Sequence, residues 1–76
     1  MNNKRRKQIE NIINNLENSK DDIASILAEE QESFDNIPES LLESERAEQS
    51  QNAIDLLDDA INNLEEAITN LEEAQE

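Results

Sequence analysis

The chain has no cysteine, histidine, glycine, tryptophan or tyrosine among its 76 residues, and only one phenylalanine and one proline. Without cysteine it can form neither a disulfide framework nor a thiolate zinc site. Without histidine it lacks the most frequent general base and the most frequent metal ligand. Without glycine it cannot form the turn of a calcium-binding loop. We therefore expect a protein that is not an enzyme and that binds no metal ion or other cofactor.

Positive charge is also scarce, because 20 acidic side chains stand against six basic ones and give a net charge of −14. Such a chain is repelled by nucleic acids and anionic membranes, and it is attracted to basic protein surfaces. No apolar run reaches the length of a membrane span. Residues 4–7 are four consecutive bases, but the apolar segment of a signal peptide does not follow them. These features indicate a cytoplasmic protein with no direct contact to nucleic acid or membrane.

Residues 53–73 repeat the pattern Ala-Ile-x-x-Leu-acid-acid three times. Isoleucine and leucine therefore alternate at steps of three and four residues, which is typical of a helix that packs along a left-handed seam. The expected seam consists of Ile54, Ile61 and Ile68 in one row and Leu57, Leu64 and Leu71 in the other.

The first half of the chain has the same apolar period in a less regular form, which predicts a second helix. Its expected seam rows are Ile9, Leu16 and Ile23, and Ile12 and Ile26. Ile13 and Leu27 follow directly after the second row and are expected to lie at the edge of the stripe.

Pro38 separates the two helical patterns, because proline cannot continue a helix and disfavours helical geometry at the preceding residue. Asn36 with Glu39, or Ser40 with Glu43, could cap the next helix. We expect one all-α domain over residues 1–76, with helices at about 3–33 and 39–75 and a turn at 34–38. A short connection makes the helices antiparallel neighbours, so that residue i faces roughly residue 74 − i.

The predicted hairpin has two different broad sides. One side is acidic and consists of Glu10, Glu17, Asp55, Asp58, Glu65 and Glu72, bordered by Asp59, Glu66 and Glu73. The other side is nearly uncharged and presents Ala53, Ala60 and Ala67 with Leu56 and several asparagines. Because a lone two-helix hairpin buries little apolar surface, we expect this alanine face to pack on a second copy and form a four-helix bundle.

The acidic side has two interpretations. It could be a solvated coat that keeps a structural or adaptor coiled coil in solution. It could also imitate the phosphates of DNA, because the lysine and arginine side chains of a DNA-binding cleft pair with either anion. The bases at residues 4–7 are expected to lie beside Glu65, Glu66, Glu72 and Glu73 and to neutralise the open end of the hairpin.

The stretch Phe34-x-Asn36-Ile37-Pro38-Glu39-Ser40-Leu41-x-x-Ser44-Glu45-Arg46 resembles the turn motif of a group of small acidic proteins from Gram-positive bacteria and their phages. The resemblance implies a helical hairpin and a phage setting.

Small acidic phage proteins of similar size include uracil-DNA glycosylase inhibitors, anti-CRISPR proteins and anti-restriction proteins. By analogy, the acidic side would bind a basic DNA-handling enzyme of the host. The same analogy suggests an apolar contact with that enzyme, for which the candidates are Ile13, Leu27 and Leu56.

Overall fold

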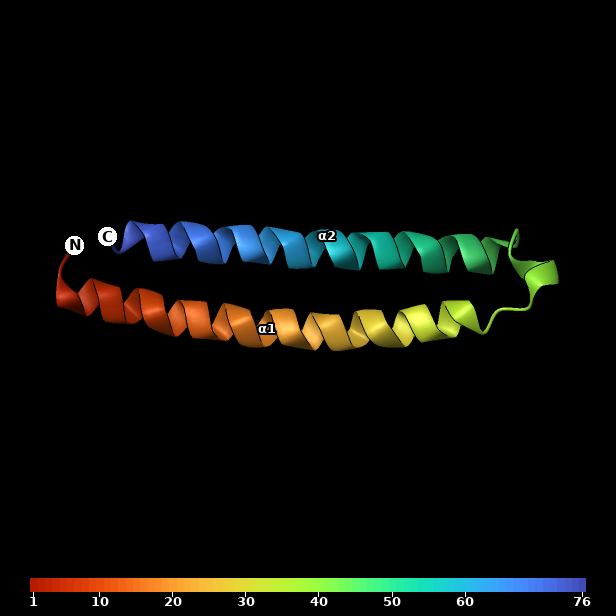
Figure 1. Cartoon of the computed structure of the whole chain (residues 1–76), viewed down its shortest axis with the longest axis horizontal. Coiled ribbons are helices and arrows are strands. Elements are labelled where there is room, and N and C mark those ends of the chain that lie inside the picture. Colours follow the sequence, from red (N-terminus) through yellow and green to blue (C-terminus); the bar gives the residue numbers. More distant parts are fainter.

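The structure is a computed structural model that describes all residues from 1 to 76, and it is an antiparallel helical hairpin (Figure 1). Helix α1 spans Asn3–Asp35, a short 3-10 helix η1 spans Glu39–Leu41, and helix α2 spans Glu45–Ala74. The hairpin is 59 Å long and only 15 by 13 Å across, measured over its Cα atoms. Both chain termini lie at the end opposite the turn. The predicted all-α hairpin is confirmed.

Both ends of α1 have a local chemical cause. The side chain of Asn2 accepts a hydrogen bond from the backbone N–H of Arg5 at 2.8 Å, which satisfies one free donor of the first turn. At the other end the helix stops at Asp35, two residues later than predicted. Pro38 follows shortly after, and it has no N–H to donate to a further helical turn.

Helix α2 begins at Glu45 rather than at about residue 39, because Ser44 is its cap. The Ser44 hydroxyl accepts a hydrogen bond from the backbone N–H of Ala47 at 3.3 Å. Neither predicted cap, Asn36 or Ser40, starts this helix. Residues 39–41 instead close a separate 3-10 turn, in which the N–H of Leu41 donates to the carbonyl of Pro38 at 2.8 Å. The connection between the long helices is therefore longer than expected.

Replacing Ser44 with alanine should destabilise the protein by about 1 kcal/mol, because the cap hydrogen bond to Ala47 is lost. Ser40→Ala is the matched control, since Ser40 lies in η1 and caps neither long helix. Urea unfolding followed by circular dichroism measures both variants. Equal stability of the two variants would contradict the assignment of Ser44 as the cap.

The two helices pack in a register that differs from the predicted one by almost one heptad. The Arg6 side chain donates from Nε to the carbonyl of Gln75 at 3.1 Å, and the Ser50 hydroxyl donates to Glu30 Oε1 at 2.8 Å. Residues whose numbers add up to about 80 therefore face each other, not those that add up to 74. The later start of α2 explains the difference, because it moves the centre of the turn towards the C-terminus.

The seam of α1 also differs from the prediction. Ile13 and Leu27, expected at the edge, are half-buried, whereas Ile12 and Ile26, expected inside, are 47% and 52% exposed. The half-buried residues of α1 follow steps of three and four throughout, and they include polar side chains. They are Arg6, Ile9, Ile13, Leu16, Lys20, Ile23, Leu27, Glu30 and Phe34, with Glu17 beside them.

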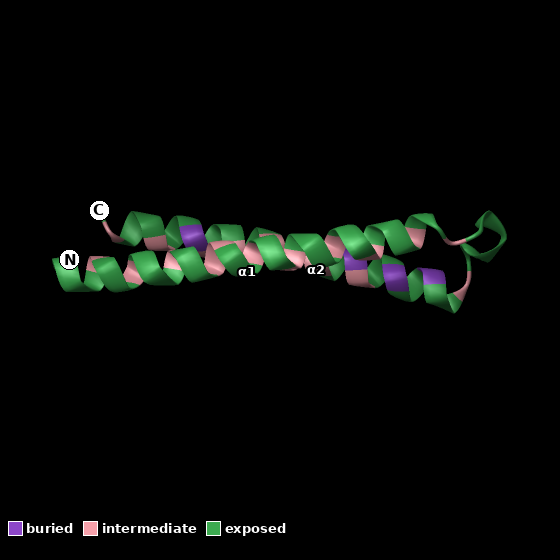
Figure 2. Ribbon diagram, turned by 90° about the horizontal axis from the view of Figure 1, so that it is seen from below, coloured by how far each residue is buried: buried purple, intermediate pink, exposed green.

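The core between the helices is thin. Only four residues are buried, and all of them belong to α2: Ala47, Ser50, Ile54 and Ile68 (Figure 2). The two helices cross at a shallow angle and lie side by side along their length (Figures 1 and 2). The large surfaces on either side of the seam therefore remain open to solvent, and they carry the features that bear on function.

Candidate acidic interface

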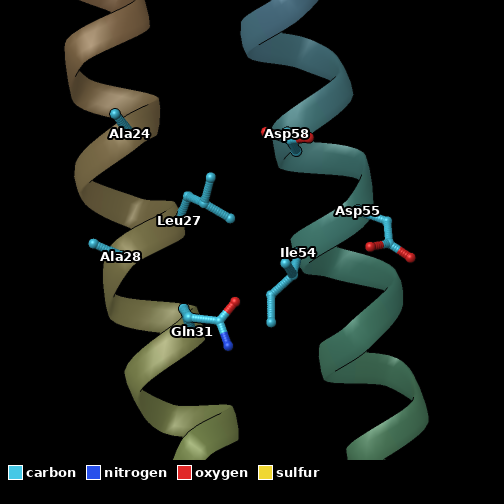
Figure 3. Close-up of a pocket in the computed structure, with 7 residues that line it drawn as sticks. All are labelled: Ala24, Leu27, Ala28, Gln31, Ile54, Asp55 and Asp58. Carbon is cyan, nitrogen blue, oxygen red and sulfur yellow. The ribbon is translucent and has the colours of Figure 1, made fainter.

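One side of the seam is marked by a groove of about 420 Å³ in the turn-proximal half of the hairpin. Leu27 of α1 and Ile54 of α2 point towards each other at its floor (Figure 3). Its rims carry Ala24 and Gln31 from α1, and Asp55 and Asp58 from α2. These residues therefore flank the same side of the seam, although the chain separates them widely.

The seven-residue period extends this side along the hairpin. Glu10 and Glu17 precede Ala24 in one row of α1, and Glu65 and Glu72 follow Asp58 in one row of α2. The predicted acidic side chains are thus placed along one side of the molecule, with Asp59, Glu66 and Glu73 at its outer border. We call this set the acidic face: Glu10, Glu17, Asp55, Asp58, Asp59, Glu65, Glu66, Glu72 and Glu73. All of them are exposed except Glu17, which is half-buried.

Lys20 is the only base that pairs with an acid in the whole chain. Its Nζ lies 3.2 Å from Glu17 Oε2, and its side chain is 23% exposed because it occupies a seam position between Ile13 and Leu27. The hydrogen bond to Glu17 raises the pKa of Lys20 above its usual value against an opposing effect of desolvation, and Glu65 across the seam adds to the rise. The acidic face is otherwise uncompensated. Sequence reasoning missed Lys20, because a lysine inside an apolar seam breaks the pattern used to find that seam.

Two of the three side chains predicted to give an apolar contact lie deeper than expected. Ile13 and Leu27 are half-buried in the seam, and Leu27 lies at the floor of the groove beside Asp55 and Asp58. Leu56 is 68% exposed, as expected. The exposed isoleucines of α1 are Ile12 and Ile26, which the predicted pattern had placed inside.

The bases at the start of α1 make no ion pair with the acids of α2 beside which they were expected to lie. Arg6 donates to the backbone carbonyl of Gln75, and neither it nor Lys4, Arg5 or Lys7 makes an ion pair. The register places these residues beside the last turn of α2, which contains Glu72 and Glu73, and not beside Glu65 and Glu66.

The opposite side of the seam is free of acids along most of its length. Near the turn, Ser33 of α1 and Arg46 of α2 line one hollow together. Each of these two residues belongs to a row that repeats every seven residues along its helix. The rows contain Ile12, Ser19 and Ile26 on α1 and Ala53, Ala60 and Ala67 on α2, and we call these two rows the neutral face. Leu56, Asn63 and Asn70 form the adjoining row of α2, and Gln8, Asn15, Asp22 and Glu29 that of α1.

Comparison with models of known families, with curated proteins and with solved structures finds no match to this chain. Neither long helix has the length and apolar character needed to cross a membrane. No three acidic side chains converge on a point where they could hold a metal ion.

Proposed function

We propose that the protein is an acidic DNA mimic of phage origin that inhibits a DNA-handling enzyme of the host by occupying its DNA-binding cleft. The first candidate target is uracil-DNA glycosylase, followed by a CRISPR nuclease and a restriction enzyme. The observation that carries the proposal is the acidic face, which runs along one side of an elongated hairpin with Lys20 as its only paired base.

The density of charge supports this function. A net charge of −14 over a length of 59 Å gives one negative charge per roughly 4 Å. Duplex DNA carries about one per 1.7 Å, and a single strand carries about one per 3.4 Å. The hairpin therefore resembles one strand in linear charge density, and it would fit the track that an enzyme provides for a single sugar–phosphate backbone.

The arrangement of the charges supports it as well. A coat that only keeps a coiled coil in solution normally mixes acids and bases, because opposite charges four residues apart stabilise a helix and like charges destabilise it. Here α2 contains the single base Arg46 and a double row of acids. The chain thus retains repulsion between its own side chains, and arginine or lysine side chains of a bound enzyme would relieve that repulsion.

The test removes charge from the acidic face without changing its shape. Asp58→Asn, Asp59→Asn, Glu65→Gln and Glu66→Gln are combined in one variant, and inhibition of uracil-DNA glycosylase is measured against a DNA substrate. Wild-type protein should compete with DNA, and it should associate more slowly as salt rises. The variant should stay helical and lose about tenfold or more in affinity, because electrostatic steering and pairing are both weakened.

A control variant removes four acids outside the acidic face and therefore has the same net charge: Asp22→Asn, Glu29→Gln, Glu39→Gln and Glu43→Gln. It should inhibit almost as well as wild type. Equal inhibition by all three proteins would exclude mimicry by the acidic face. If no nucleic-acid enzyme is inhibited and the stable partner is a structural protein, the adaptor function replaces this proposal.

A further inference from the structure

The neutral face leaves apolar side chains uncovered in a protein that buries very few. Ile12 is 47% exposed, Ile26 is 52% exposed, and Leu56 in the adjoining row is 68% exposed. Ala53, Ala60 and Ala67 run beside the isoleucines at intervals of one heptad. This pattern of large side chains next to a row of small ones lets another helix pair approach closely.

The total accessible surface indicates how much more surface the elongated hairpin exposes than a compact monomer of the same mass. A compact monomer of 8.7 kDa is expected to expose about 4,700 Å². The hairpin exposes 5752 Å², which is about 1,000 Å² more. A stable protein–protein interface removes about 800 Å² from each partner. The excess surface is therefore about the size of one such interface.

The distribution of charge decides which partner fits. The two rows of the neutral face contain no acidic residue, whereas the acidic face lies on the other side of the seam. A second copy carries the same net charge of −14, so it can approach closely only where both surfaces lack acids. We propose that the neutral face joins two hairpins into a four-helix dimer, with both acidic faces directed outwards.

The orientation of the two hairpins follows from an asymmetry along their length. The half next to the turn, residues 20–60, holds thirteen acids and two bases, while the half next to the termini holds seven acids and four bases. Stacking the hairpins with their turns at opposite ends brings unlike halves together and separates the most acidic ones.

In this dimer the two-fold axis passes close to Ser19 and Ala60, which lie midway along the rows of the neutral face. Each copy of α1 then stacks on α1 of the other hairpin. Ile12 lies opposite Ile26 of the second copy, and Ala53 lies opposite its Ala67.

Sedimentation equilibrium at about 100 μM tests the association. Interfaces of this size have dissociation constants in the micromolar range or below, so this concentration favours the dimer. Wild-type protein should have about twice the mass of the 8.7 kDa chain. Ile26→Glu should give monomers that remain helical. Asn18→Glu adds the same charge on the exposed surface away from the seam, and it should still dimerise. A monomeric wild type, or an Ile26→Glu variant that stays dimeric, would overturn the proposal.

The orientation is tested with single-cysteine variants, which is straightforward because the chain has no cysteine of its own. Ile12→Cys and Ile26→Cys proteins, one of them carrying a purification tag, are mixed and oxidised. Turns at opposite ends predict a disulfide between the two different variants. Disulfides within each variant alone would overturn this orientation.

The dimer does not depend on the inhibitory function. The variant with four neutralised positions on the acidic face should dimerise at least as well as wild type, since those positions lie outside the neutral face. Failure of that variant to dimerise would contradict the placement of the interface, whatever the result of the inhibition assay.

Discussion

Replacing Ile54 with aspartate should unfold the protein at room temperature. Ile54 is 8% exposed and faces Leu27 across the seam, so the substitution removes an apolar contact and places a carboxylate in the buried part of the seam. The expected cost is about 3 kcal/mol or more. A hairpin with only four buried residues has little stability in reserve. Loss of the helical circular dichroism signal is the measurement.

Asn52→Asp is the control for this substitution. Residue 52 lies half a turn away in the same helix and is exposed, and the change adds the same single charge. Its stability should stay within about 0.5 kcal/mol of wild type. If both variants unfolded equally, net charge rather than the seam would limit stability, and the observed packing would be contradicted.

A disulfide between residues 30 and 50 should raise the free energy of unfolding by about 3 kcal/mol, because it closes a long loop in the unfolded chain. Glu30 and Ser50 already meet across the seam through a hydrogen bond of 2.8 Å, and the chain has no other cysteine to interfere. The double variant Glu30→Cys/Ser50→Cys is compared in its oxidised and reduced forms by urea unfolding.

The control pair follows the register predicted from the sequence. Ala24 would face Ser50 if facing residues added up to 74. In the structure, Ala24 lies six residues from Glu30, which is about 9 Å along the helix and too far for a disulfide. Ala24→Cys/Ser50→Cys should therefore form no intramolecular bond. An efficient bond in this pair would contradict the observed register.

The difference between the two registers shows where sequence reasoning reached its limit. The apolar period of residues 53–73 predicted α2 and its seam correctly, because every heptad there repeats the same residue types. The start of α2 could not be predicted from the local sequence, because Asn36, Ser40 and Ser44 are all good caps and only packing decides among them. The later cap at Ser44 shortened α2 and shifted the register.

The row Ile9, Leu16 and Ile23 of the α1 seam was predicted correctly, but the row Ile13, Lys20 and Leu27 was not, and Glu30 at the end of the first row was also missed. An apolar pattern passes over Lys20 and Glu30, and it fits Ile12 and Ile26 better than the true second row. In the structure, each polar side chain has a partner that offsets its partial burial: Glu17 for Lys20 and Ser50 for Glu30. This error did not change the placement of the acidic face, since most of its residues belong to the regular heptads of α2.

Three of the four buried residues, Ala47, Ser50 and Ile54, lie in the first third of α2, close to the turn. Contacts there join parts of the chain that are near in sequence, so they can form with the smallest loss of loop entropy. Contacts further from the turn close ever longer loops, up to Arg6 with Gln75. The hairpin is therefore expected to fold from the turn towards the termini. Thermal fluctuations should separate the paired termini first.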